Sequence, residues 1–208
     1  NTTMMPLRHW LDFLFPPRTD ELILRNVSDD DFLTLVTPRL VPITRPETVM
    51  LLPFNDASVR ATIHEAKYHG SARAFTLLAA SLSEYLRDAD DGFTKTIIVP
   101  VPLGKGRHRE RGFNQVEEVA RRATKELGIA VDTSLLVRTR ETASQVSLPR
   151  AAREENMRGA FRATRRADPA HLYMVLDDVT TTGATLQAAI DALREAGAEH
   201  IVPLALAH

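Results

Sequence analysis

The sequence contains no cysteine, which excludes disulfide bonds and metal sites built on thiolates. No apolar run approaches the roughly 18 residues that a membrane-spanning helix needs. Residues 4–17 are amphipathic and include Arg8, His9 and Asp12, so we expect no signal peptide there. The formal net charge over 208 residues is −1, so charge alone gives no reason to expect a nucleic-acid-binding protein. Together these absences predict a cytoplasmic protein that does not contact a membrane.

The composition is that of a globular protein, with 44% apolar and 25% charged residues. Its length suits one α/β domain with a small appendage. Short apolar runs predict four strands, at residues 96–101, 133–137, 172–176 and 201–206. Apolar residues at helical spacing lie between most of these runs, for example at residues 116–127. Alternating strands and helices predict an α/β fold in which helices flank a parallel sheet.

The N-terminal quarter of the chain is harder to interpret. We predict that residues 18–50 form a loop-rich segment with one short helix near residues 32–36. Pro38, Pro42 and Pro46 interrupt any longer element. Residues 49–54 are a candidate strand. We therefore divide the chain into an N-terminal appendage, residues 1–55, and a second domain, residues 56–208. The appendage is expected to cover the sheet as a hood of helices and loops.

Two helices are predicted next, over residues 58–68 and 71–86, from the spacing of their apolar residues. The turn between them contains Lys67 and ends at Gly70, which suits the C-terminus of a helix. Two interpretations of Lys67 stay open at this point. It is either a solvated side chain beside the cap or a contact to a ligand.

Residues 172–185 combine a strand, two acids and a loop that opens a helix. The apolar run at 172–176 is followed by Asp177 and Asp178, where the strand should end. A loop rich in hydroxyl groups then leads into a helix; it consists of Thr180, Thr181, Thr182, Gly183, Ala184 and Thr185. Such a loop at the carboxyl end of a parallel strand offers backbone N–H groups to a phosphate. Because the acids would repel a phosphate, we expect them to bind sugar hydroxyls or a metal.

A second candidate phosphate site follows the strand at 96–101. We predict a basic turn there that contains Leu103, Gly104, Lys105, Gly106, Arg107, His108 and Arg109. Its glycines allow close approach of the backbone to a ligand, and its cations could neutralise a second phosphate group. The alternative is a solvated basic turn without a ligand.

A long polar stretch at residues 138–158 separates the two candidate sites along the chain. Loops of this length inside a compact domain are usually functional lids or disordered segments. The residues that we expect to act in a flexible loop here are Arg138, Arg140, Gln145, Arg150 and Arg153.

Residues 172–185 resemble the phosphoribosyl diphosphate (PRPP) motif of type I phosphoribosyltransferases: a hydrophobic strand, two acids and Thr-Thr-Gly-x-Thr. The resemblance implies the type I phosphoribosyltransferase fold and PRPP as a ligand together with Mg²⁺. It assigns the ribose hydroxyls to Asp177 and Asp178, as catalytic residues that stabilise positive charge on the ribose and that could also hold the metal. It assigns the 5-phosphate to residues 180–185, the pyrophosphate to residues 103–109 and a closing lid to residues 138–158.

Further blocks narrow the resemblance to the ComF family of competence-associated, phosphoribosyltransferase-like proteins. They lie at residues 11–18, 63–70, 99–103, 109–115 and 150–161. That family usually carries a cysteine zinc module after the first block. Here no cysteine is present, so we expect no zinc site, and residues 19–48 stand in place of that module.

Two functional hypotheses follow from this resemblance. One is an active enzyme that transfers a phosphoribosyl group from PRPP to an unidentified acceptor and releases pyrophosphate. The other is a non-catalytic PRPP- or nucleotide-binding accessory protein in DNA uptake during natural transformation. In the second hypothesis, the partners would be single-stranded DNA or proteins of DNA uptake and replication restart. The basic clusters at 105–111 and 150–166 could form the DNA contact. The acceptor and the oligomeric state cannot be predicted from this sequence.

Overall fold

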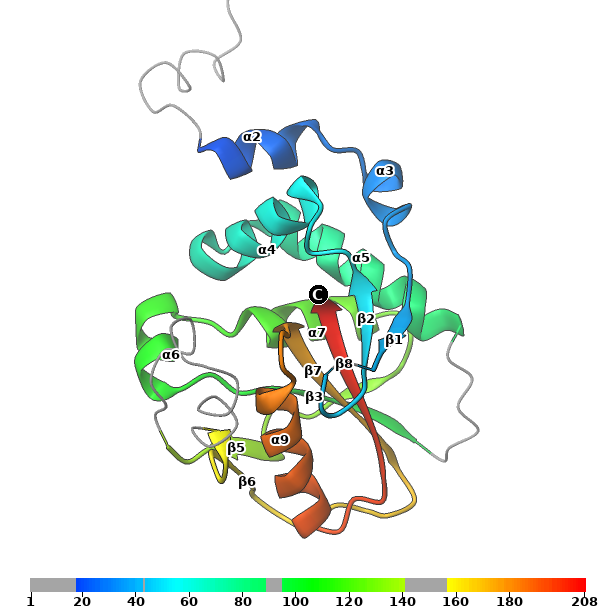
Figure 1. Ribbon diagram of the computed structural model, residues 1–208, viewed down its shortest axis with the longest axis vertical. Coiled ribbons are helices and arrows are strands. Elements are labelled where there is room, and N and C mark those ends of the chain that lie inside the picture. The colour runs from blue at the N-terminus through cyan, green and yellow to red at the C-terminus, as the bar shows by residue number, and fades with distance from the viewer. Residues whose placement is uncertain (1–17, 43, 89–94, 141–156) are drawn as a thin grey trace, which may run out of the picture.

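The computed structural model describes residues 18–42, 44–88, 95–140 and 157–208, and Figure 1 shows its ribbon. Its centre is a six-stranded sheet in the order β1-β2-β8-β7-β3-β4. The edge strand β1 is antiparallel to β2, and the other neighbouring strands are parallel. The strands are β1 (Arg39–Val41), β2 (Thr48–Leu52), β3 (Thr96–Pro100), β4 (Ala130–Val131), β7 (Leu172–Val179) and β8 (His200–Ala207). The predicted α/β class with a mainly parallel sheet is confirmed.

Helices cover both faces of this sheet. Those needed below are α2 (Thr19–Asn26), α3 (Asp29–Leu33), α4 (Ala57–His69), α5 (Ala72–Asp88), α6 (Lys105–Arg111), α7 (Gln115–Thr124) and α9 (Ala184–Glu195). The helices predicted over residues 58–68 and 71–86 are confirmed as α4 and α5. The model adds α2 within a segment predicted to be loop-rich. None of the helices in the described part of the chain is both long and apolar enough to cross a membrane.

The alternation of side chains along β7 divides the core into two parts. Leu172, Met174 and Leu176 pack into the cluster that includes apolar residues of α4, α5 and α7. Tyr173 and Val175 point the other way and pack with apolar residues of α9. Successive side chains of a strand face opposite sides of a sheet, so this division is what a strand buried on both faces requires. Figure 1 shows α9 on one side of β7 and α7 on the other.

The N-terminal segment contributes strands to the sheet as well as a cover. Val49 and Met50 of β2 pair with Leu204 and Ala205 of β8, and β1 pairs with β2. The candidate strand at residues 49–54 is thus confirmed as β2, whereas the expectation of a hood of helices and loops did not include β1. In Figure 1, α2 and α3 lie at the outer side of α4 and α5. The division of the chain at residue 55 stays a prediction, although strands on its N-terminal side belong to the central sheet.

The strand predicted at residues 133–137 does not join the parallel sheet. Residues Leu136–Arg138 form β5, which pairs antiparallel with β6 (Phe161–Ala163) in a separate two-stranded sheet. The central sheet instead ends at β4, whose two residues pair with Ile97 and Ile98. A short apolar run predicts a strand but not its partner, because the partner is chosen by contacts between distant parts of the chain.

Candidate functional site

The two predicted acids lie inside β7 rather than after it. The strand continues to Val179, which pairs with Ala207 of β8, so Asp177 and Asp178 are the sixth and seventh residues of β7. Consecutive residues of a strand point to opposite faces. Asp178 therefore faces α4 and α7, and Asp177 faces the side on which α9 packs. Sequence reasoning placed both acids at the carboxyl edge of the sheet, but it missed that they enter different surroundings.

Asp178 is held by side chains of two helices. Only 8% of the residue is exposed. Gln115, the first residue of α7, donates its Nε2–H to Asp178 Oδ2 at 2.7 Å. Lys67 Nζ of α4 lies 3.5 Å from the same oxygen, and the other oxygen, Oδ1, accepts the backbone N–H of Val179 at 2.7 Å. This set of donors and the nearby ammonium group hold the carboxylate in a fixed orientation.

The contacts of Asp178 continue outward to an exposed tyrosine. Gln115 Oε1 accepts a hydrogen bond from Arg111 Nη1 at 3.0 Å. The Arg111 guanidinium lies 5.2 Å from the ring centre of Tyr68, which is 54% exposed. Lys67 thus pairs with Asp178, so it is more than a solvated side chain beside the helix cap. Lys67, Arg111 and Gln115 were not among the predicted site residues.

Asp177 has a different electrostatic environment. Its Oδ1 accepts the backbone N–H of Asp178 at 2.9 Å. Removal from water, followed by the negative charge of Asp178, raises the pKa of Asp177 from 3.8 to about 7. The charges of Lys67 and Arg107 act in the opposite direction without cancelling this rise. A carboxyl group with a pKa near neutrality gains stability from a bound cation or from a hydroxyl donor.

The loop after β7 is organised around a buried threonine and a glycine. Thr180 is 5% exposed, and its Oγ1 accepts the backbone N–H of Gly183 at 3.1 Å. Gly183 begins α9 with a φ of 82°, in the left-handed region that suits glycine. A Cβ at this position would lie 2.6 Å from the carbonyl oxygen of Arg45. The backbone N–H of Arg45 in turn donates to the Thr182 carbonyl at 3.1 Å, so an N-terminal segment closes one side of the loop.

The hydroxyl groups of this loop differ in accessibility. Thr181 is exposed and Thr182 and Thr185 are partly exposed, whereas Thr180 is buried and already accepts a backbone bond. Gly183 and Ala184 are buried at the start of α9. The model therefore brings the predicted residues 180–185 together beside the acids. It gives Thr180 a structural contact within the loop.

The predicted basic turn is mostly a helix. Residues Lys105–Arg111 form α6, after Leu103 and Gly104. The prediction of a turn was wrong for most of this segment, because Gly104 is the N-cap of α6 and Gly106 lies within the helix. Leu103, Lys105, His108 and Arg109 line a hollow of about 480 Å³. Lys105, His108 and Arg109 are exposed, and the charge of Arg107 acts on Asp177.

The predicted flexible loop is described only at its two ends. Arg138 lies with its guanidinium 5.3 Å from the ring centre of Phe161, and Arg140 Nη2 donates to the Arg158 carbonyl at 3.0 Å. Both arginines thus contact the segment that returns through β6. The remaining predicted residues, Gln145, Arg150 and Arg153, lie outside the described residues.

Comparison with known proteins gives a partial relationship. No protein-family model matches the chain. The chain is 40% identical over 89 residues to the DNA utilization protein YhgH of Salmonella typhimurium, and 39% identical over 89 residues to that of Escherichia coli K12. It is 32% identical over 106 residues to Competence protein F of Haemophilus influenzae. The chain is homologous to ComF-family proteins over these segments. The resemblance found in the sequence is confirmed to that extent.

The matched segments are a minority of each relative. The YhgH alignment covers 43% of this chain and 39% of the Salmonella protein, and the Competence protein F alignment covers 50% and 46%. The chain thus matches less than half the length of these relatives. The homology applies to the aligned segments alone. The activity and the partners of this chain are therefore matters for a proposal.

Proposed function

We propose that the protein binds PRPP together with Mg²⁺ at the carboxyl edge of its sheet and transfers the phosphoribosyl group to an acceptor. The proposal includes the type I phosphoribosyltransferase fold. The observation that carries it is the continuity of three features: the acid pair in β7, the threonine-rich loop, and the N-terminus of α9. This order matches the PRPP motif, and a loop that opens a helix at the end of a parallel strand is of the kind that binds phosphate, which supports the proposal.

In this proposal the loop holds the 5-phosphate. The hydroxyls of Thr181, Thr182 and Thr185, which are exposed or partly exposed, supply donors of the kind that bind a phosphate. The positive end of the α9 dipole adds to this attraction. Thr180 has a supporting role, because its hydroxyl already fixes the backbone of Gly183.

The acids hold the ribose, with unequal roles. Asp178 is oriented by its contacts with Gln115 and Lys67, so it would present a fixed carboxylate to the ribose hydroxyls. The pKa of Asp177 is about 7, which means that the neighbouring cations do not fully offset the cost of its negative charge. Carboxylate oxygens are ligands that Mg²⁺ accepts, so Asp177 fits a Mg²⁺–PRPP complex. When bound, Mg²⁺ would neutralise charge on the diphosphate of PRPP.

The reaction breaks the bond between ribose C1 and the diphosphate oxygen and forms a bond from C1 to the acceptor. Pyrophosphate leaves with the electron pair of the broken bond, and positive charge builds on the ribose. Nearby carboxylates stabilise that charge. The exposed cations of α6 and Arg107 would attract the leaving pyrophosphate. The acceptor stays unidentified, and an amine acceptor would need no catalytic base.

Release of pyrophosphate from PRPP tests the activity directly. The purified chain is incubated with PRPP, Mg²⁺ and a panel of amines and nucleobases, and pyrophosphate is quantified by a coupled assay. We expect release that depends on one class of acceptor, and a loss of at least about 100-fold in the Asp177→Asn/Asp178→Asn double variant. Binding of PRPP without release for any acceptor would reject the transferase and retain the PRPP site.

A second candidate function is that of an accessory protein that contacts single-stranded DNA. The names of the relatives, DNA utilization protein and Competence protein F, motivate it. Lys105, His108 and Arg109 also place exposed basic groups on α6. Binding of a fluorescent single strand should weaken steeply with salt, because phosphate contacts release counterions. A Lys105→Gln/Arg109→Gln variant should bind more weakly, and absent or salt-insensitive binding would reject this candidate.

A further inference from the structure

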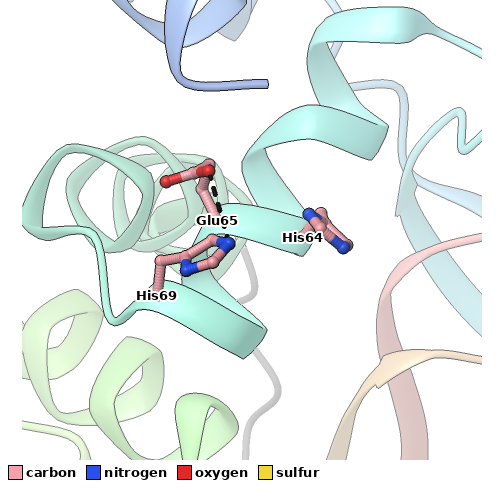
Figure 2. Close-up of side chains that lie close together, drawn as sticks. All are labelled: His64, Glu65 and His69. Atoms are coloured by element: carbon pink, nitrogen blue, oxygen red, sulfur yellow. Dashed lines mark ion pairs between the residues drawn. The ribbon is translucent and has the colours of Figure 1, made fainter. Parts of the chain in front are cut away.

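Three potential metal ligands lie together on α4, apart from the acid pair. They are His64, Glu65 and His69, and one ligand atom of each lies within 4.8 Å of the others. Figure 2 shows the imidazole of His69 beside the carboxylate of Glu65, with His64, the residue before Glu65, farther to the right. Residues four apart share one helix face, which accounts for the pairing of Glu65 with His69.

The spacing of these atoms is nearer to that of metal ligands than to that of a hydrogen bond. His69 Nε2 lies 3.9 Å from Glu65 Oε1. Two ligand atoms that each lie about 2.1 Å from a tetrahedral zinc ion are separated by about 3.4 Å. Even three atoms at the full 4.8 Å from one another lie only about 2.8 Å from their common centre. A shift of roughly 0.7 Å per side chain would therefore bring all three to bonding distance.

The chemistry of this set suits a borderline transition-metal ion. Two imidazole nitrogens and one carboxylate oxygen bind zinc, cobalt or nickel, whereas Mg²⁺ and Ca²⁺ prefer oxygen ligands alone. The absence of cysteine excluded thiolate sites only. A carboxylate that is 2% exposed, as in Glu65, also differs from the solvated acids common on protein surfaces.

Neighbouring side chains already orient two of the three ligands. Asp20 Oδ2 lies 2.8 Å from His64 Nδ1, the arrangement by which a carboxylate orients a metal-binding histidine. Arg18 donates to both oxygens of Glu65, at 3.0 Å and 2.9 Å. Each carboxylate oxygen has a second lone pair, so Glu65 can bind an ion while Arg18 keeps at least one of its bonds.

The helix that carries the ligands is fixed at both ends. The Asp56 side chain accepts the N–H groups of Ser58 and Val59 at the start of α4, and Gly70 ends the helix in the left-handed conformation. Val59, Ile63 and Ala66 are buried against the core. The ligand backbone is therefore rigid, and only side-chain rotations are needed to complete a site.

We propose that His64, Glu65 and His69 bind one divalent transition-metal ion, with Zn²⁺ as the probe ion. Arg18, which contacts Glu65, directly precedes α2, and Asp20, which contacts His64, lies in the first turn of α2. The ion consequently ties α2 to α4 and stabilises this part of the N-terminal cover. The site is separate from the PRPP site and does not depend on that assignment.

Calorimetric titration of Zn²⁺ into the untagged, chelator-treated full chain tests this site. We expect one ion per chain, a raised melting temperature, and a loss of affinity of at least about 100-fold in His64→Ala and in His69→Ala. Asp20→Asn, which alters only the orienting contact, should cost about tenfold. His171→Ala is the matched control, because His171 lies just before β7, pairs with Asp168 at 3.7 Å, and should leave binding unchanged when it is replaced.

Co²⁺ provides an independent readout of the coordination. The imidazoles of His64 and His69 should give visible bands of the intensity typical of four- or five-coordinate Co²⁺, and these bands should disappear in the His64→Ala/His69→Ala variant. Both histidines are exposed, so we expect the double variant to fold. Circular dichroism checks that it does. Equal Zn²⁺ affinity in the wild-type protein and the folded double variant, or no binding to the wild-type protein, would overturn the proposal.

Discussion

The two sides of the candidate PRPP site are built in different ways. On one side, Asp178 is fixed by side chains, through Gln115 and Lys67. On the other side, the loop that opens α9 is fixed by backbone contacts, with Gly183 against the carbonyl of Arg45 and the Arg45 N–H on Thr182. Charge and hydrogen-bonding chemistry therefore govern the acid side, and the space between two backbones governs the loop side. The two sides should respond to different kinds of change.

The largest effect is expected on the loop side, from Gly183→Ala. The new Cβ would lie 2.6 Å from the Arg45 carbonyl oxygen, at a φ of 82° that disfavours alanine. We expect a loss of about 3 kcal/mol or more in the free energy of unfolding, measured by denaturant titration. Gly128→Ala is the matched control, because its φ is 69° and no atom lies within 4 Å of a Cβ there. It should cost only about 1 kcal/mol, and equal losses would contradict the close approach.

On the acid side, Gln115→Leu should have the next largest effect. It removes the amide that donates to buried Asp178 and leaves the same oxygen facing Lys67 Nζ at 3.5 Å without that hydrogen bond. We expect a loss of about 1–3 kcal/mol in the free energy of unfolding. Gln187→Leu is the control, since Gln187 makes the same kind of bond to Asp191, also at 2.7 Å, on the exposed surface of α9. A similar loss in both variants would show that burial of the acid pair is not what makes Gln115 matter.

A smaller effect should separate the two acids by their response to pH. The pKa of Asp177 is raised to about 7, so the folded state holds this proton more tightly than the unfolded state does. Ionisation of Asp177 therefore removes stability as the pH rises from about 4 to 7. Without divalent cations, Asp177→Asn should gain on the order of 1–2 kcal/mol relative to wild type across this range. Parallel curves of melting temperature against pH would contradict the raised pKa.

How far the sequence predicts this molecule depends on the range of the contacts involved. The helices α4, α5 and α9 and the strand β7 were predictable, because the spacing of apolar residues is a local signal. The loop that we propose for the 5-phosphate could be singled out from the sequence because its residues are consecutive. The bond between Gln115 and Asp178 spans 63 positions, so it was set by the packing of α7 on the sheet and not by a local pattern. The same reason explains why the partner of β5 was predicted wrongly.

The central proposal is that the acid side and the loop side bind PRPP together. A shift in melting temperature measures this binding most directly. Melting temperature is recorded for the wild-type protein and for Asp177→Asn/Asp178→Asn, with PRPP, Mg²⁺, both or neither. We predict a rise for the wild-type protein that requires both ligands, and no rise for the double variant, because the ligand binds only the folded state. An equal rise in the two proteins, or none in the wild-type protein, would contradict a PRPP site at the carboxyl end of β7.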